Sequence, residues 1–201
     1  MIVSYTGISM TKDDIIALPN DHLRQRSKKI GLVSDDVMHL VGDMEAALLD
    51  WEASREHEVG VALAAVQIDQ LLRVVVIRNN LDDKSDHNFT VYFNPEITKY
   101  EGKLVEDFEG CLSIKDVYGR VPRYERVRVK ALNIDGRQVR IRAEGFLART
   151  FQHEIDHTNG VVFIDHIKDK QDAFFKIMDD GKLDPLDYDE HIKDNQSLWE
   201  E

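Results

Sequence analysis

The sequence predicts one α+β domain, in which small antiparallel or mixed β-sheets surround a central helix. Three observations favour this class: a long helical periodicity at residues 34–56, β-type apolar runs from residue 61 to 143, and a second helical segment starting at Gly145. A chain of 201 residues with 42% hydrophobic and 32% charged side chains is long enough to bury a core. A single domain is therefore expected.

The first element is an amphipathic helix over residues 34–56. Ser34 is a suitable N-cap, and Asp35 and Asp36 bring negative charge to the first turn, where the helix dipole is positive. Apolar residues recur at helical spacing along this segment, so it should pack one face against the core. These residues are Val37, Leu40, Val41, Met44, Leu48 and Trp51.

Short strands should follow this helix. Apolar runs at residues 61–65, 73–77 and 89–93 predict three strands, the last two separated by a polar loop. Residues 127–143 predict a hairpin with one solvated face, because apolar and charged residues alternate on both sides of a turn at residues 133–136. The apolar positions of the hairpin are Val127, Val129, Ala131, Val139, Ile141 and Ala143.

Beyond the hairpin, a second helix is expected to start near Gly145 and to carry Phe146, Leu147, Phe151 and Ile155 on its apolar side. Another helix is expected over residues 168–180, docked by Phe174, Phe175, Ile177 and Met178. Residues 168–201 hold 11 Asp and Glu against 5 Lys, which favours a solvated, partly helical extension that is not a separate domain.

Composition excludes several classes of protein. The net charge of −12 opposes attachment to phosphate backbones, so direct recognition of nucleic acid is not expected. Charges interrupt every apolar run before the roughly 18 residues that a membrane span requires. The N-terminus lacks the pattern of a secretory signal, and the single cysteine, Cys111, rules out an internal disulfide. A cytoplasmic protein is expected.

Residues 153–157 carry the pattern H-E-x-x-H. Two imidazoles four residues apart, His153 and His157, share one face of a helix about 6 Å apart along the axis and can bind one cation. A solvated surface helix is the alternative, but large apolar neighbours favour an interior or a cleft. Glu154 would take a proton from the metal's water and pass it to the leaving amine. Asp156 lies off the ligand face and could orient a ligand imidazole or a nearby backbone group, with simple solvation as the alternative.

Two histidines leave a catalytic metal one protein ligand short. Asp165 and the later acids are candidates for the third ligand, whereas His166 lies nine residues after His157, a spacing that does not match peptidases whose third histidine follows by six. Cys111 is the other candidate, as a thiolate. The pattern alone leaves this choice open.

Three separated segments resemble the signature motifs of the peptide deformylase family. They are GVALAAVQ at residues 60–67, EGCLS at residues 109–113 and QHEIDH at residues 152–157, in the family's order and spacing. The resemblance runs from about residue 18 to 167. It implies a catalytic domain over residues 1–167, with residues 168–201 as the acidic extension.

The family's activity is removal of the formyl group from the N-terminal methionine of new polypeptides, releasing formate. The resemblance implies Cys111, His153 and His157 as metal ligands and Glu154 as general acid and base. Gln67, through its amide, and Leu112, through its backbone N–H, would stabilise the charge that develops on the formyl oxygen.

The resemblance also implies the cofactor, the partners and the substrate contacts. The cofactor would be one divalent ion, natively Fe²⁺, with Zn²⁺, Ni²⁺ or Co²⁺ able to replace it. The partners would be N-formylmethionyl nascent peptides and the ribosome exit region, and the protein would be a monomer without contact to a membrane. Gly110 lacks a Cβ and would let the backbone approach the metal and the substrate. The full set of implied substrate contacts is Gly60, Val61, Ala62, Glu109, Gly110, Phe146, Arg149 and Thr150.

The chain departs from the family pattern at a few positions. Ala62 replaces a glycine and Val66 a position that is often proline, and Ala62 adds a methyl group beside the expected substrate groove. Arg149 and Thr150 replace apolar residues of the methionine pocket, which predicts a polar pocket rim in which Arg149 pairs with Asp107. Alternatively, Arg149 extends to water and leaves the pocket apolar.

Two other functions are alternatives to a deformylase. A different H-E-x-x-H amide hydrolase, such as a small peptidase, would take its third ligand downstream of His157 rather than from Cys111. A noncatalytic relative would keep the fold and bind nascent chains. The second alternative is weakened because no catalytic residue of the family is missing.

Overall fold

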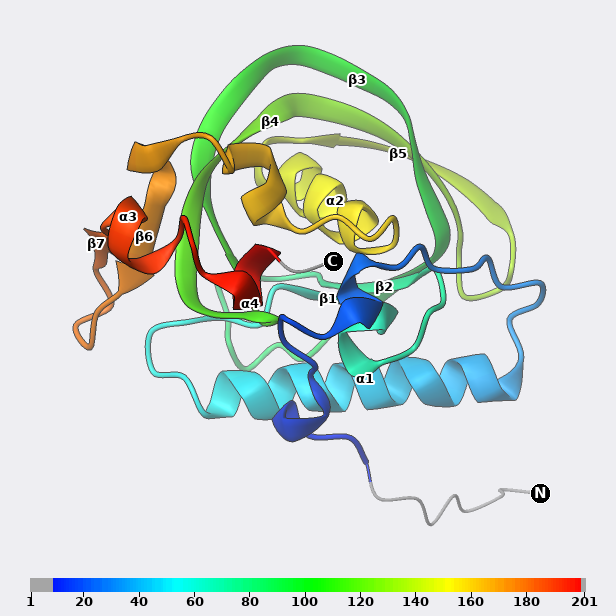
Figure 1. Ribbon diagram of the computed structural model, residues 1–201. Coiled ribbons are helices and arrows are strands. Elements are labelled where there is room, and N and C mark those ends of the chain that lie inside the picture. Colours follow the sequence, from blue (N-terminus) through cyan, green and yellow to red (C-terminus); the bar gives the residue numbers. More distant parts are fainter. Residues whose placement is uncertain (1–8, 200–201) are drawn as a thin grey trace.

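The computed structural model describes residues 9–199 (Figure 1). Within them, seven strands form one antiparallel sheet in the order β1-β2-β3-β4-β6-β7, and β5 pairs with another part of β4. The strands are β1 (Ala62–Ala64), β2 (Val74–Arg78), β3 (Phe89–Cys111), β4 (Ile114–Leu132), β5 (Gln138–Glu144), β6 (Phe174–Ile177) and β7 (Leu183–Pro185). The α-helices are α1 (Asp35–Ala53), α2 (Gly145–His157), α3 (Tyr188–His191) and α4 (Gln196–Trp199). The α+β class predicted from the sequence is confirmed.

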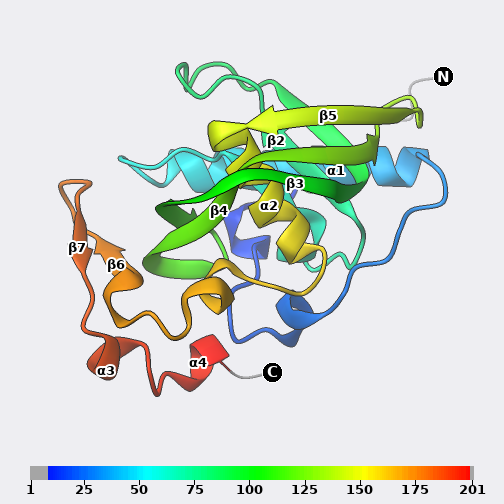
Figure 2. The same ribbon diagram turned by 90° about the horizontal axis from the view of Figure 1, so that it is seen from above.

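Helix α1 lies along one side of the sheet, and α2 lies on the other side, beneath the curved strands β3, β4 and β5 (Figures 1 and 2). Strand β2 shows why the molecule needs both helices. Val74 and Val76 pack in the cluster that contains α1, whereas Val75 and Ile77 pack in the cluster that contains α2. Both faces of β2 are buried, which explains its continuous apolar run.

Both long helices begin where the sequence predicts. The Ser34 side chain accepts a hydrogen bond from the backbone N–H of Val37, so Ser34 is the N-cap of α1. This helix ends at Ala53, three residues before the predicted end. Helix α2 begins at Gly145 and ends at His157, so both histidines of the H-E-x-x-H pattern lie on it.

The hairpin predicted over residues 127–143 is present as the end of β4 and all of β5. Val127 pairs with Ala143 and Val129 with Ile141, and these apolar residues pack in the cluster that contains α2. The strand predicted at residues 89–93 is much longer in the structure and continues to Cys111. Most of residues 94–111 are exposed, and four register shifts interrupt the pairing of β3 with β4. The sequence of this part of β3 therefore shows no alternation of apolar and polar residues.

The helix predicted over residues 168–180 is wrong. A short 3₁₀ turn at Gln171–Ala173 leads into β6, which pairs with residues 117–119 of β4, and β7 then pairs with β6. The expectation of a solvated terminus is also wrong for part of this segment. Ile192 and Leu198 are 1% and 8% exposed, in a cluster with Phe163 and Phe174. The helix was wrongly predicted because the period of a four-residue strand cannot be distinguished from helical spacing.

Among residues 9–199, no helix has both the length and the apolar character that crossing a membrane requires.

Candidate active site

Cys111 and the two histidines of α2 converge at one point. One ligand atom from each of Cys111, His153 and His157 lies within 4.8 Å of the others. The Cys111 Sγ atom is 3.3 Å from His157 Nε2, and the two imidazole rings are 4.9 Å apart between centroids. The cysteine ends β3, which runs beside α2, so residues more than forty positions apart meet. One sulfur and two nitrogens fit a divalent transition metal with a remaining position for water.

The charge state of Cys111 suits a metal ligand. Burial would raise the pKa of the Cys111 thiol, but the charge of His157 and hydrogen bonds with both imidazoles lower this pKa to about 5. The thiolate is the form that binds metals.

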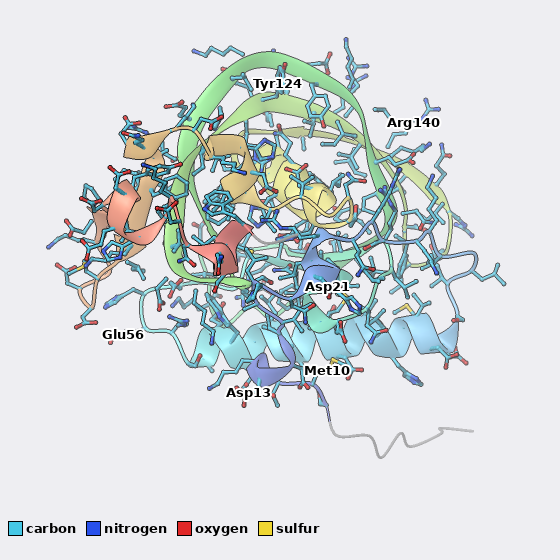
Figure 3. The ribbon with its side chains drawn as sticks, in the orientation of Figure 1. Met10, Asp13, Asp21, Glu56, Tyr124 and Arg140 are labelled. Atoms are coloured by element: carbon cyan, nitrogen blue, oxygen red, sulfur yellow. The ribbon has the colours of Figure 1, made fainter. Side chains whose placement is uncertain are left out.

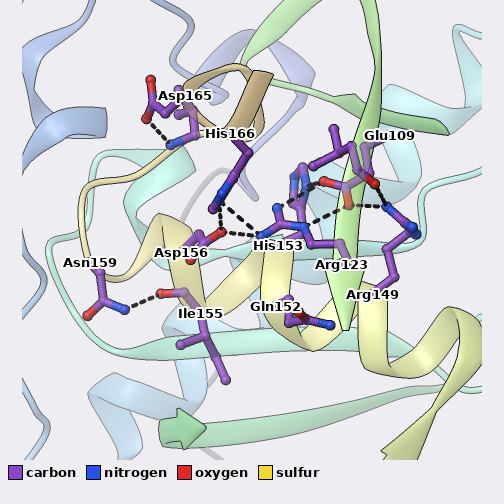
Figure 4. Close-up of polar contacts among 12 residues, drawn as sticks. Glu109, Arg123, Arg149, Gln152, His153, Ile155, Asp156, Asn159, Asp165 and His166 are labelled. Atoms are coloured by element: carbon purple, nitrogen blue, oxygen red, sulfur yellow. Dashed lines mark hydrogen bonds and ion pairs between the residues drawn. The ribbon is translucent and has the colours of Figure 1, made fainter. Parts of the chain in front are cut away.

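Glu109, rather than Asp156, orients a histidine of this cluster. Glu109 Oε2 lies 3.0 Å from His153 Nδ1, which leaves the other ring nitrogen facing the cluster (Figure 4). Asp156 instead pairs with Arg123 and with His166, whose Nε2 is 2.7 Å away. Asp156 therefore does not orient a ligand imidazole, and that expectation is wrong. No pattern in the sequence indicates the contact of Glu109, which depends on β3 lying beside α2.

Glu109 is the centre of a buried charge cluster that we call the Glu109 network: Glu109, Arg123, Arg149 and His153. Arg123 donates two hydrogen bonds to the carboxylate, at 2.9 and 3.0 Å, and Arg149 donates one at 2.7 Å (Figure 4). Burial opposes ionisation, yet hydrogen bonds from His153 and Arg123 hold the pKa of Glu109 well below its usual range. The carboxylate is therefore charged and fully hydrogen-bonded.

Arg149 does not extend to water. It is 7% exposed and donates to the backbone carbonyls of Val105 and Val121, both at 2.8 Å, as well as to Glu109. Its contact with Asp107 is to the backbone carbonyl, at 3.3 Å. The predicted ion pair between Arg149 and Asp107 is therefore wrong, because Glu109 takes that position. Thr150 donates to the carbonyl of Phe146, one turn earlier in α2.

Gln67 is held in one orientation beside Cys111. Its Oε1 atom accepts from the backbone N–H of Ala64 at 2.9 Å, and its Nε2 atom donates to Ser113 Oγ at 3.2 Å. The same Nε2 atom is 3.6 Å from Cys111 Sγ. The amide N–H group therefore faces the ligand cluster.

Glu154 is the second buried carboxyl group at this point. It is 4% exposed, and its Oε2 atom has no hydrogen-bond partner within the described residues. Burial raises the pKa of the Glu154 carboxyl group. An unpaired carboxyl oxygen beside a ligand cluster can exchange a proton with a bound molecule.

A cavity of about 310 Å³ opens onto this cluster. Of the site residues expected from the sequence, all line it except Gly60 and His157. The sequence did not indicate the wall opposite α2, where Tyr118 donates to Glu58 at 2.6 Å and Arg55 lies 3.2 Å from Asp116. Further lining residues that were not predicted include Trp51, His57, Val59, Phe108, Ile114, Lys115 and Val117.

Two glycines of the motifs have packing roles. A Cβ at Gly60 would lie 2.9 Å from the Leu48 side chain, so this glycine lets the chain cross α1. A Cβ at Gly110 would lie 2.6 Å from the Tyr118 ring. The close neighbour of Gly110 is therefore an aromatic side chain of the cavity wall, which gives this glycine a packing role. The approach of its backbone to metal and substrate stays a prediction.

Comparisons with known proteins agree with this geometry. The family model described as Polypeptide deformylase matches residues 12–173. Peptide deformylases of Mesorhizobium japonicum and Thermomicrobium roseum are 43% and 41% identical to this chain, over 81% and 78% of its length and 88% and 86% of theirs. A structure of a class I type b peptide deformylase from Acinetobacter baumannii with Met-Ala-Ser bound is 31% identical, covers 80% of this chain and 99% of that chain, and has a TM-score of 0.68. Since the family model matches residues 12–173, which are most of the sequence, the chain belongs to the peptide deformylase family.

Proposed function

We propose that this protein hydrolyses the N-formyl group from the N-terminal methionine of newly made polypeptides, releasing formate and a free amine. The observation that carries the proposal is the convergence of Cys111, His153 and His157 beside two further groups, Glu154 and Gln67, at one cavity. Membership of the deformylase family and the chemistry of these side chains support the same reaction.

Cys111, His153 and His157 would hold one divalent cation, which when bound acts as a Lewis acid and lowers the pKa of a water molecule toward neutrality. We propose Fe²⁺ as the native ion, with Zn²⁺, Ni²⁺ or Co²⁺ able to occupy the same ligands. Glu109 supports this role by fixing the ring of His153 at 3.0 Å.

Glu154 would carry the proton of the reaction. Its buried and unpartnered Oε2 atom can accept a proton from the attacking water and then donate it to the departing amine nitrogen. Gln67 Nε2 and the backbone N–H of Leu112 would donate hydrogen bonds to the formyl oxygen as charge develops there. One such donor typically lowers the barrier by about 3 kcal/mol.

The rest of the cavity would hold the peptide. Val61 and Ala62 at the start of β1, and Gly110 at the end of β3, bring backbone to the cavity on two sides. Phe146, Arg149 and Thr150 line it from α2. The polar rim remains a prediction, now with Arg149 fixed by Glu109 and two carbonyl groups.

Formate release decides the assignment. The protein, purified without oxygen and loaded with Fe²⁺ or Ni²⁺, should release formate from formyl-Met-Ala-Ser. Cys111→Ser should lose both metal and activity, whereas Glu154→Gln should keep the metal and lose at least about 100-fold in kcat. His87→Ala, a change at an exposed histidine that does not line the cavity, is the control. Absence of turnover with a filled metal site would contradict the proposal.

The peptidase alternative is disfavoured by the downstream residues. Asp165 pairs with Arg24 at 2.7 Å and accepts from the backbone N–H of Val162, and His166 binds Asp156. These side chains have other partners and do not belong to the cluster of ligand atoms. Cleavage of an unformylated Met-Ala-Ser peptide would revive this alternative.

We also propose that the enzyme acts as a monomer in the cytoplasm, close to the ribosome exit region, because its substrates are nascent chains. Sedimentation of the metal-loaded protein should give a mass near 23.2 kDa. A stable dimer at micromolar concentration would contradict the monomer.

A further inference from the structure

The charge of the molecule is unevenly distributed. Residues 120–144 contain eight Lys and Arg and three Asp and Glu, in a chain whose totals are 26 and 38. Although the whole chain has a net charge of −12, this segment is positively charged. It forms most of β4 and all of β5. The expectation that the chain repels phosphate backbones rests on the total charge and does not describe this surface.

The basic residues of this segment share one side of the sheet. Val127, Val129 and Ala143 face α2 in a buried cluster. The residues that alternate with them therefore point to the opposite, solvated side. We call the set of five cations on that side the basic face. Its members are Arg126, Arg128, Lys130, Arg140 and Arg142.

The register brings four of these cations side by side, whereas Arg126 pairs in the ladder with Glu144. Arg128 pairs in the ladder with Arg142, and Lys130 pairs with Arg140. Directly opposite side chains lie about 5 Å apart at their Cβ atoms, and like charges in such positions destabilise a sheet. Folding stability therefore does not explain why four cations occupy these positions.

Only part of this charge is neutralised. Arg128 binds Glu101 at 2.7 Å, and Lys130 binds Glu96 at 2.9 Å. Arg126, Arg140 and Arg142 are exposed and form no ion pair or hydrogen bond through their side chains within residues 9–199. Arg140 extends outward from the sheet, on the side away from α2 (Figure 3). Three guanidinium groups are therefore available to a ligand.

We propose that the basic face binds the phosphate backbone of RNA and so holds the enzyme where nascent chains are made. Guanidinium groups bind phosphate with two parallel hydrogen bonds, which a flat row of arginines can offer repeatedly. Along a strand, alternate residues are about 7 Å apart, so successive cations can contact successive phosphates. The proposal rests on the proposed function, since nascent formylated peptides are presented by an RNA-rich particle.

Docking through this face would leave the catalytic cavity open. No member of the basic face lines the cavity that opens onto Cys111. The cavity is lined instead by Trp51 of α1 and residues that follow this helix, by the β3 and β4 ends near Cys111, and by α2. RNA and a peptide substrate can therefore be bound together.

The test measures binding of a fluorescent RNA hairpin of about 24 nucleotides to the metal-loaded protein by anisotropy, from 50 to 200 mM KCl. Arg126→Gln, Arg140→Gln and Arg142→Gln combined should weaken binding at least tenfold and lower the salt slope by about 2 to 3, because three phosphate contacts are lost. The matched control combines Lys12→Gln, Lys182→Gln and Lys193→Gln, three exposed lysines elsewhere with the same total charge change. The control should bind as the unchanged protein does.

Formate release from formyl-Met-Ala-Ser is measured on the same samples and should be equal for all three proteins. Equal activity with unequal RNA binding supports the proposal, and absence of activity in every sample tests the proposed function separately. The proposal is overturned if the unchanged protein does not bind the hairpin at 50 mM KCl, or if both triple variants lose binding equally. Binding to phosphatidylserine vesicles without binding to RNA would also overturn it.

Discussion

The arginines of the Glu109 network and those of the basic face have the same chemistry but opposite surroundings. Arg123 and Arg149 are 4% and 7% exposed, and both donate to the carboxylate of Glu109, which is 5% exposed. Arg140 and Arg142 are exposed and have no anionic partner within the described residues. Burial makes pairing obligatory because an unpaired charge loses its hydration, whereas exposure leaves the charge free for an outside ligand.

The largest effect is expected for Glu109→Gln, which removes the partner of His153 and the only anion that Arg149 contacts within residues 9–199. The free energy of unfolding of the metal-free protein should fall by about 3 kcal/mol, because the buried Arg149 loses its counter-charge and Arg123 keeps only Asp156. Metal affinity should fall about 10- to 100-fold. Urea denaturation and competition with a chelator measure these two quantities.

Asp107→Asn is the matched control, because Asp107 is exposed and, in the part of the chain that the structure describes, its carboxylate accepts only from the neighbouring backbone N–H of Phe108. Stability and metal affinity should remain unchanged. If Glu109→Gln behaved like this control, the distinction between buried and exposed charge would not hold at this site.

The next effect concerns Arg149→Met, which keeps the length of the side chain but removes its donors. The carbonyls of Val105 and Val121 would lose their bonds from Arg149, which should cost about 2 kcal/mol in urea denaturation. Arg149→Lys should recover part of the loss. Arg149→Met should also shift kcat/KM in favour of formyl-Met and formyl-Nle peptides over peptides with a polar first residue. An unchanged preference would contradict the predicted polar rim.

A smaller, pH-dependent effect is expected at Glu96, which is half-exposed between Lys29 and Lys130. Hydrogen bonds from these lysines lower the pKa of Glu96 from 4.5 to about 2. The folded protein binds this proton less readily than the unfolded chain, so the pairing stabilises the fold above pH 4.5 and the benefit is lost as the pH falls toward 2. Glu96→Gln should cost at most about 1 kcal/mol at pH 7 and nothing near pH 2. Thermal unfolding against Glu56→Gln, an exposed glutamate, provides the comparison.

The smallest effect is expected for Arg142→Gln. Its removal relieves a like-charge contact with Arg128 across the ladder, so the free energy of unfolding should stay constant or rise by a few tenths of a kcal/mol. Urea denaturation measures this change. A loss above about 1 kcal/mol would show that Arg142 stabilises the fold.

The sequence predicted those parts of the fold in which one face is buried. Helix α1, helix α2 and the hairpin of β4 and β5 each show a period that matches their burial. The outer half of β3 has little buried surface and several register shifts, so its length could not be predicted. Strand β6 is four residues long, too short for its period to be distinguished from that of a helix.

In the active site, too, only the features that are local in sequence could be predicted from spacing. The histidines at 153 and 157 are local in sequence, so their shared face could be predicted from spacing alone. Cys111 followed from the resemblance of its motif. The contact between Glu109 and His153, and the wall formed by Tyr118 and Glu58, depend on which strands and loops become neighbours. Spacing along the chain carries no signal for such contacts.

The pairing of β6 with residues 117–119 of β4 has a consequence for shortened forms of the protein. A chain that ended at residue 167 would keep the ligands and the cavity, but it would present an open strand edge with unpaired backbone groups. Phe163 and Ile167, which pack over Gly119, would lose the cover of Phe174 at the same place. Exposed edges of this kind recruit other chains, so the acidic extension guards the enzyme against self-association.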